Sequence, residues 1–238
     1  MTGLEVLVAL AAVAAGSTVQ RTLGFGAALV SVPLLLLIDP RLVPGPITIA
    51  GLALIGLMLV GTHRDADWRG VRWIAVGLVP GTVVAGVAVA LLPQTMLVAG
   101  AGLLILAAVG AVLAQRHPPV GRRSLLGSGA LSGFMGTTAG VGGPPVALLY
   151  HGAQAAVLRA TLARVFLVSA VLTLVALAGA RRLGTTEWMT GLALMPGGPL
   201  GYAVGGRLAG RVDGARLRTG VLVVSALSAL AAIARALL

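Results

Sequence analysis

The sequence predicts an all-α integral membrane protein made of two homologous halves, and three observations lead to this fold class. The chain of 238 residues is 58% hydrophobic and has a mean hydropathy of +1.04, well above the roughly half-apolar composition of soluble domains. Its apolar runs reach the roughly 20 residues that a helix needs to cross about 30 Å of hydrocarbon. A set of glycines, with an acidic residue beside a tryptophan, also occurs twice along the chain.

In the first half, one interrupted apolar segment precedes three continuous helices. The interrupted segment covers residues 4–38 and is broken near residues 16–26, where glycine, threonine and arginine replace the apolar pattern. The three transmembrane helices are expected within residues 42–62, 71–92 and 94–114. The part after the break is too short to cross the bilayer. We therefore expect half-helices that meet at membrane depth, where protein or a water-filled cavity must cover the non-helical backbone.

The second half repeats this plan, which gives about eight hydrophobic segments in all. Its interrupted segment covers residues 124–151, is broken near residues 136–145, and is again followed by three helices. The expected organisation is a first transmembrane repeat at residues 1–115, a basic cytoplasmic linker at 116–123, and a second transmembrane repeat at 124–238. Duplicated halves with weak sequence symmetry are common among secondary transporters.

The duplication rests on residues that match at two nearly equal spacings. At an offset of 120 the matching residues are Asp67-Trp68 with Glu187-Trp188, Gly77 with Gly197, Gly81 with Gly201, Gly86 with Gly206, Leu97 with Leu217, and Gly100 with Gly220. At an offset of 116 they are Thr22 with Thr138, Gly24 with Gly140, and Gly26 with Gly142. Single glycine matches carry little weight in a chain with 35 glycines, but the acid-tryptophan pair and the ordered spacing carry more.

Charge and composition exclude several classes of protein. The net charge of +11 comes from arginine alone, and in so apolar a chain it indicates cytoplasmic loops with positive charge, not nucleic-acid binding. The six acidic residues all fall at a terminus or between apolar runs, and there is no cysteine. We therefore expect no catalytic residues, no metal site and no cofactor, and no nucleotide-binding loop is present.

The two breaks contain the candidate substrate-binding residues. Glycine lets the backbone turn and approach a ligand, and a helix that begins inside the membrane offers free N–H groups to an anion. The candidates are Gln20, Arg21, Thr22, Gly24, Phe25 and Gly26 in the first break, and Thr137, Thr138, Gly140, Val141, Gly142, Gly143 and Pro144 in the second. Glycines that pack helices together are the alternative, and we favour it for Gly86, Gly205 and Gly206.

Two arginines lie where a cation is costly. Arg21 is inside the first break, and Arg164 is well inside the apolar run 153–180. A charge at such depth marks a pathway or a partnered site, and no acidic residue is available nearby in the sequence. We expect the substrate anion to be the partner of each, with backbone carbonyls or a snorkelling side chain as the alternatives.

The residues of both breaks resemble the sulfite exporter TauE/SafE family of membrane transporters. The resemblance lies in Gly24-Phe25-Gly26 leading to Val32-Pro33-Leu34, and in Gly133-Phe134 followed by Gly140-Val141-Gly142-Gly143-Pro144. It implies a secondary transporter that exports a small sulfur-containing anion such as sulfite, sulfoacetate or thiosulfate. The first motif differs by having Ala27-Ala28 where the family often has glycine. An anion channel is the alternative within transport, and a membrane-embedded enzyme is a more distant one.

The expected location is the inner, cytoplasmic membrane, with several crossings. The expected partners are the lipid bilayer and a small anion, while coupling to protons or another ion and homodimer formation stay open. If each broken segment returns to its own side, the two halves are inverted repeats and residues 207–218 lie in the cytoplasm with the linker. If the broken segments cross fully, the halves are parallel. Loop arginines favour the inverted arrangement, although Arg181 and Arg182 would then face outward.

Overall fold

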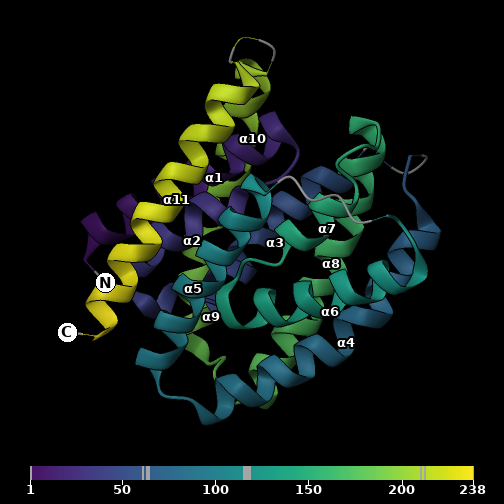
Figure 1. Ribbon diagram of the computed structural model, residues 1–238. Coiled ribbons are helices and arrows are strands. Elements are labelled where there is room, and N and C mark those ends of the chain that lie inside the picture. The colour runs from purple at the N-terminus through teal and green to yellow at the C-terminus, as the bar shows by residue number, and fades with distance from the viewer. Residues whose placement is uncertain are drawn as a thin grey trace.

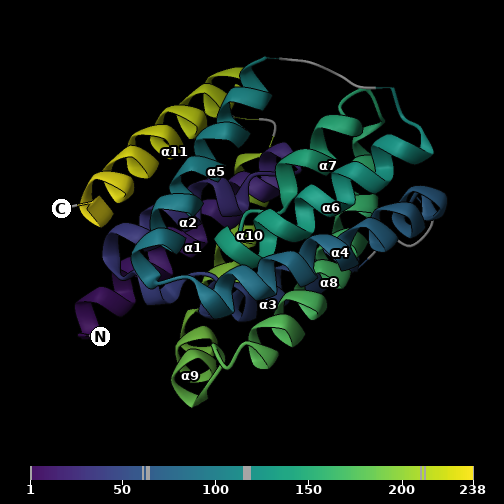
Figure 2. The ribbon, with the colours of Figure 1, turned by 60° about the horizontal axis from the view of Figure 1, so that its bottom comes forward.

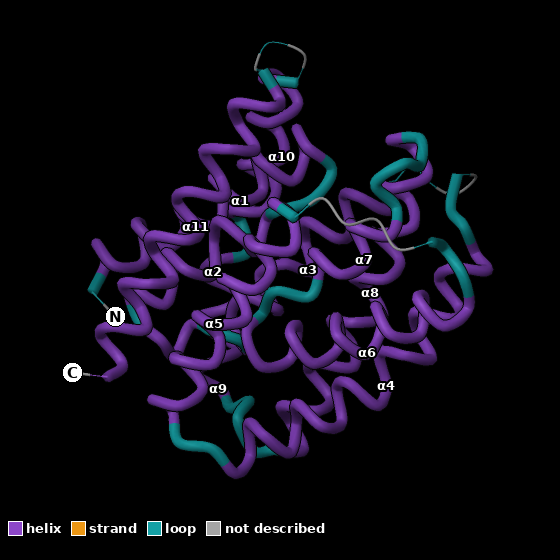
Figure 3. Tube along the Cα trace, in the orientation of Figure 1, coloured by secondary structure: helices purple, strands orange, loops and turns teal. Residues whose placement is uncertain are grey.

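The computed structural model describes residues 2–60, 62, 65–114, 119–209, 211 and 213–237, and over these ranges it is helical, with short connections and no strand (Figures 1 and 3). The elements in chain order are α1 (Gly3–Leu23), α2 (Ala27–Ile38), the 3-10 helix η1 (Pro40–Leu42), α3 (Gly45–Leu59), α4 (Trp68–Leu91), α5 (Gln94–Leu113), α6 (Arg122–Ala139), α7 (Gly143–Leu149), α8 (Ala155–Gly179), α9 (Thr185–Leu194), α10 (Gly197–Leu208) and α11 (Gly214–Leu237). The prediction of an all-helical chain is confirmed.

Five helices are long and apolar enough to cross a membrane. These are α1, α4, α5, α8 and the part of α11 from Arg216 to Ala236. Large apolar side chains cover their outer faces. Val83 and Val84 on α4, for example, are more than half exposed, which suits contact with lipid tails. The chain is therefore a multi-pass membrane protein by helix length, composition and surface.

Both interrupted segments are broken, and each break is only three residues long. The first lies between α1 and α2 at Gly24-Phe25-Gly26, and the second lies between α6 and α7 at Gly140-Val141-Gly142. Gly24, Gly26 and Gly140 have φ values of 87°, 107° and 69°, the left-handed region that glycine adopts without steric cost. The first break is narrower than the sequence suggested. Gly16 stays helical, and its missing side chain leaves room for Ser31 and Ala27 of α2.

One expectation for the second half is wrong. In place of three continuous helices, its middle segment is divided into α9 and α10 at Met195-Pro196. Proline has no N–H to donate, and its ring crowds the carbonyl of the preceding turn. The chain makes tighter turns here: the Met195 amide donates to the Leu192 carbonyl, and the Gly198 amide donates to the Met195 carbonyl, each three residues back. In the first half, the equivalent helix α4 continues unbroken past Pro80.

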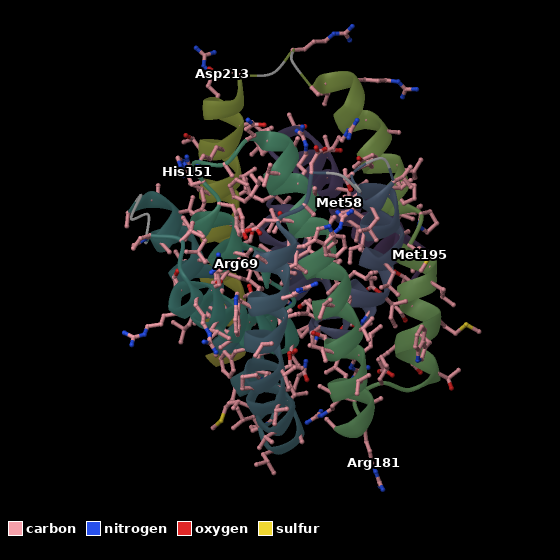
Figure 4. All side chains as sticks on the ribbon, turned by 90° about the vertical axis from the view of Figure 1, so that its right-hand side faces the viewer. Met58, Arg69, His151, Arg181, Met195 and Asp213 are labelled. Atoms are coloured by element: carbon pink, nitrogen blue, oxygen red, sulfur yellow. The ribbon has the colours of Figure 1, made fainter. Side chains whose placement is uncertain are left out.

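The molecule has two ends that differ in charge. At the arginine-rich end, α3, α5 and α10 finish and α4, α6, α8 and α11 begin. The contacts that join these elements include Arg218 to the Val112 carbonyl at 3.1 Å and the Asp67 amide to Thr161 at 3.1 Å. The arginines of this end are Arg69, Arg72, Arg122, Arg123, Arg159, Arg207, Arg211, Arg216 and Arg218. Figure 4 places Asp213 at one extreme and Arg181 at the other.

The opposite end holds both termini of the described chain (Figure 2). Arg182 at the end of α8 donates to the Leu92 carbonyl after α4, at 3.3 Å. Gln94 at the start of α5 donates to the Pro40 carbonyl after α2, also at 3.3 Å. The segment α1–α2 therefore starts at this end and returns to it.

The segment α6–α7 does the reverse. It starts at the arginine-rich end, where Arg122 lies 4.1 Å over the Trp73 ring. It returns there, where Tyr150 after α7 donates to Asp67 at 2.7 Å. Each broken segment is therefore a hairpin, and the two hairpins enter from different ends.

Glycines bring two pairs of helices into backbone contact, and the two pairs occupy positions that match at the sequence offsets of 120 and 116. Gly77 and Gly81 of α4 face the carbonyls of Leu126 and Ala130 on α6. Their repeat partners Gly197 and Gly201 of α10 face the carbonyls of Leu10 and Ala14 on α1. Because Leu10 and Ala14 precede Leu126 and Ala130 by the same 116 residues, the two crossings are built alike. The helices α3 and α8 pack on each other, as do α5 and α11, so each of these pairs joins the two halves.

Candidate functional site

One cavity of about 150 Å³ lies between the two breaks. Its wall is formed by α1, α2, α3, α6, α7, α8 and the first residues of α10. Seven of the candidate residues line it, namely Gln20, Gly26, Gly140, Val141, Gly142, Gly143 and Pro144. The structure thus brings both breaks to one cavity, although they are more than 100 residues apart in the sequence.

Gln20 holds the first break closed. Its side chain is 3% exposed, its Nε2 donates to the Gly24 carbonyl at 3.1 Å, and its Oε1 accepts the Ala27 amide at 3.1 Å. One amide side chain therefore connects the last turn of α1 to the first turn of α2. A second contact of Nε2 is with the Met58 sulfur at 3.7 Å, and a thioether is a weak acceptor.

The second break is held by different groups. The Ser132 hydroxyl of α6 donates to the Gly142 carbonyl. Gly136, the repeat partner of Gln20, has no side chain, and Gly142 packs directly against it. The Thr137 and Thr173 hydroxyls are 2.9 Å apart and join α6 to α8. The first break is therefore closed by a side-chain clip, whereas the second is closed by a serine and a backbone contact.

Several polar groups face the cavity, but few have a hydrogen to offer. The hydroxyls of Ser17, Ser31 and Thr48 donate to backbone carbonyls at 2.8 to 3.0 Å. The first amides of a helix lack an intrahelical acceptor. Of those in α2, Ala27 donates to Gln20, which leaves the Ala28 and Leu29 amides. Gln20 Nε2, the Ser169 hydroxyl and the Gly143 amide at the start of α7 are further neutral donors on lining residues.

Arg21 does not line the cavity. It is exposed on the last turn of α1, donates to the Tyr202 hydroxyl of α10 at 2.6 Å, and lies 4.4 Å over that ring. The aliphatic part of Arg21 packs on Gly205, so the predicted packing role of Gly205 is confirmed. The partner of Arg21 in the structure is therefore a tyrosine on a neighbouring helix.

Arg164 is buried but also lies outside the cavity wall. Its side chain is 6% exposed and donates to the carbonyls of Ala160 and Thr62 at 2.7 and 3.1 Å. The Trp68 ring lies 5.0 Å from the guanidinium carbon. Backbone carbonyls, the alternative that we considered the weaker one, are thus its partners in the structure. Arg164 ties the connection between α3 and α4 to α8.

The remaining candidates lie beside the cavity and contact other parts of the protein. Thr22 and Thr138 donate back to Thr18 and Phe134 within their own helices, at 2.7 Å. Phe25 packs in a cluster with Tyr150 and Leu158, and Gly24 lies next to Arg159. Thr137 reaches the cavity only through Thr173.

Sequence reasoning missed the walls contributed by α3 and α8. Phe166, Ser169 and Thr173 of α8 and Met58 of α3 all line the cavity. A signal for part of this wall was available, because Ser169 and Thr173 are four residues apart within an apolar run and so share one helix face. No comparable polar pattern marked Met58.

A polar cluster near the arginine-rich end was also missed. Asp67 accepts the Gly70 amide at 2.9 Å, which caps α4, and it accepts the Tyr150 hydroxyl at 2.7 Å. Burial, the hydrogen bond to Asp67 and the charge of that carboxylate raise the pKa of Tyr150 well above its ordinary value. Tyr150 therefore stays protonated at any physiological pH and remains a donor. The cluster joins the end of α7 to the start of α4.

The described residues contain no group of three or more His, Asp or Glu side chains that could hold a metal ion. What the site offers is a small space with neutral donors, between two glycine-rich breaks. That chemistry suits binding and release of a small solute.

Comparison with known proteins identifies the family. No curated protein and no solved structure matches the chain significantly. The family model described as sulfite exporter TauE/SafE matches residues 8–232, which include both breaks and every residue that lines the cavity. The chain belongs to the sulfite exporter TauE/SafE family of membrane transporters.

Proposed function

We propose that the protein is a secondary transporter that exports a small sulfur-containing anion through the cavity between the two breaks. The observation that carries this proposal is the cavity itself, because residues of both breaks line it. Binding sites formed by interrupted helices at the junction of two repeats are typical of secondary transporters. Candidate substrates are sulfite, sulfoacetate and thiosulfate. The proposed location is the inner membrane.

We further propose that the two halves are inverted repeats. The opposite entry of the hairpins α1–α2 and α6–α7 supports this arrangement, as does the contact between Arg182 and Leu92. Loop arginines favour the cytoplasm, and in the described chain most of them are at the arginine-rich end. The opposite end has Arg41, Arg181, Arg182 and Arg235, together with Glu5, Asp39 and Glu187. The arginine-rich end is then cytoplasmic, and both termini are outside.

A pair of glycine variants tests the cavity. Gly51 and Gly56 are both on α3, and a Cβ on either would have no neighbour within 4 Å. Of these two glycines, Gly51 lines the cavity and Gly56 does not. Gly51→Leu should therefore fill the cavity without disturbing the helix, and Gly56→Leu is its matched control, since both changes raise helix propensity alike.

The measurement is exchange of labelled sulfite in proteoliposomes loaded with unlabelled sulfite. We expect wild type and Gly56→Leu to exchange, and Gly51→Leu to be slowed by roughly tenfold or more, about 1.4 kcal/mol in the barrier. Equal exchange by the two variants would place the pathway elsewhere. Flux that is not stimulated by anion on the other side would indicate a channel.

Single cysteines test the topology, because the native chain has none. A cysteine at Gly214 should be shielded from an impermeant thiol reagent in intact cells, whereas one at Thr95 should be labelled. Both positions are exposed in the structure. Labelling of both Gly214→Cys and Thr95→Cys without permeabilisation would rule out the inverted arrangement, and labelling of Gly214→Cys alone would reverse the proposed orientation.

A further inference from the structure

We infer that the cavity selects singly charged anions, such as hydrogen sulfite or a simple sulfonate, over doubly charged ones of the same shape. This inference rests on the proposed transport function and narrows its substrates by charge: hydrogen sulfite and simple sulfonates carry one charge, whereas thiosulfate and sulfoacetate carry two at neutral pH and would be disfavoured. It follows from the lining of the cavity and from the positions of the two arginines that could have neutralised a second charge.

None of the described residues that line the cavity is charged. Arg164 directs its guanidinium to two carbonyls and the Trp68 ring, and Arg21 directs its own to Tyr202. Neither side chain belongs to the cavity wall. An anion in this space therefore has no cation in direct contact.

The cost of taking an ion from water into a site of low polarity rises with the square of its charge. A dianion thus loses about four times as much solvation free energy as a monoanion of equal size. Neutral donors recover only part of this loss, and sites for dianions commonly use arginine forks for that reason. A cavity with a few neutral donors favours the smaller charge.

Gln20 is the donor best placed to contact the anion. One hydrogen of its Nε2 is used by the Gly24 carbonyl, while the other faces the Met58 sulfur at 3.7 Å. Both Gln20 and Met58 line the cavity. An anion could replace the sulfur as acceptor at little cost, because the N–H···S contact is weak, while the bonds that close the first break stay in place.

Methanesulfonate and sulfate test this directly, since both are tetrahedral and of similar size but carry one and two charges. In the proteoliposome exchange assay, we expect methanesulfonate to inhibit sulfite exchange at a concentration roughly tenfold or more below that of sulfate. Sulfite exchange should fall as the pH rises and hydrogen sulfite loses its proton. Methanesulfonate exchange should not change over the same range, because this anion does not titrate there.

Gln20→Leu adds a test of the donor. We expect the half-inhibitory concentration of methanesulfonate to rise by roughly fivefold or more. A half-inhibitory concentration equal to that of the wild type in the folded variant would overturn the assignment of Gln20.

The possible failures are distinguishable. Equal inhibition by sulfate and methanesulfonate, with exchange intact, would overturn the charge selection and leave the transport proposal standing. Absence of exchange for every sulfur-containing anion would instead overturn the transport proposal.

Discussion

The two halves agree closely at one place and differ at another. The crossing of α4 on α6 and the crossing of α10 on α1 use repeat-related glycines against repeat-related carbonyls. The breaks differ, because Gln20 clips the first one, whereas Ser132 and the bare backbone of Gly136 hold the second. The helix after the break is also shorter in the second half, where α7 has seven residues and α2 has 12.

This difference separates features that the matched positions of the two halves share from features that they vary. Two helices in backbone contact leave no space for a side chain, so glycine is required at the same positions in both halves. A break needs only a left-handed residue and some polar group to hold it, and several side chains can supply that group. The four predictions below test this contrast.

The largest effect is expected at the helix crossings. Gly81→Ala and Gly201→Ala place a methyl group onto the carbonyls of Ala130 and Ala14. Each should cost about 3 kcal/mol or prevent folding, because backbone cannot move aside as a side chain can. Thermal unfolding in detergent measures the change. Gly100→Ala and Gly220→Ala are matched controls, since they are also a repeat pair and both positions open into free space. Equal loss in all four variants would contradict the packing explanation.

The second effect concerns the two arginines. Arg164→Leu leaves the Thr62 carbonyl without its donor and takes the side-chain donor from the Ala160 carbonyl, and it should lower the unfolding free energy by about 2 kcal/mol. Arg21→Leu removes an exposed contact with Tyr202 and should cost about 0.5 kcal/mol. Chemical denaturation in detergent, followed by tryptophan fluorescence, compares them. If Arg21→Leu lowers the unfolding free energy more than Arg164→Leu does, burial is not what decides how much each arginine contributes to stability.

A smaller effect is expected at the breaks. Gly26→Ala forces an alanine to a φ of 107° and should cost about 1 to 2 kcal/mol. Gly142 occupies the matching position of the second break but has a φ of −86°. Its alanine variant is free of left-handed strain, but its methyl group would lie 2.9 Å from the Ser132 carbonyl oxygen, so its cost has a different, steric cause. Melting temperatures measured beside Gly152→Ala, which has open space, sharpen the comparison. A Gly26→Ala variant as stable as Gly152→Ala would show that left-handed strain contributes nothing at the first break.

The smallest effect is expected at the two acid-tryptophan pairs. Asp67 caps α4 and accepts from Tyr150, whereas Glu187 accepts only the exposed Gly184 amide among the described contacts. Asp67→Asn should cost about 1 kcal/mol and Glu187→Gln only a few tenths. In a Tyr150→Phe background, Asp67→Asn should cost about as little as Glu187→Gln. A double-mutant cycle of Tyr150→Phe and Asp67→Asn measures the coupling free energy between these two side chains. No coupling in that cycle would mean that the Tyr150 bond adds nothing to stability.

Much of this architecture was predictable from the sequence because it depends on local chemistry. Apolar run length fixes where helices can cross a bilayer. The glycine clusters at residues 24–26 and 140–142 favour turns, because Gly24, Gly26 and Gly140 adopt left-handed backbone angles without steric cost. The repeated glycines predicted two related halves for the same reason, since a missing side chain is a local property. Where local signals were mixed, the prediction was less exact: Gly16 stayed helical, and Pro196 ended a helix although Pro80 did not.

The partners of polar groups were decided by tertiary structure. The sequence placed Arg164 at depth without an acidic neighbour, but it could not reveal that the Thr62 carbonyl and the Trp68 ring lie within its reach, because those residues approach it only after α3 and α4 pack on α8. The same is true of Gln20, Met58 and Ser169, which belong to separate helices and meet only at the cavity. Residue type and spacing determine which segments enter the membrane and where they break. Contacts between segments that are distant in sequence determine which side chains face the cavity.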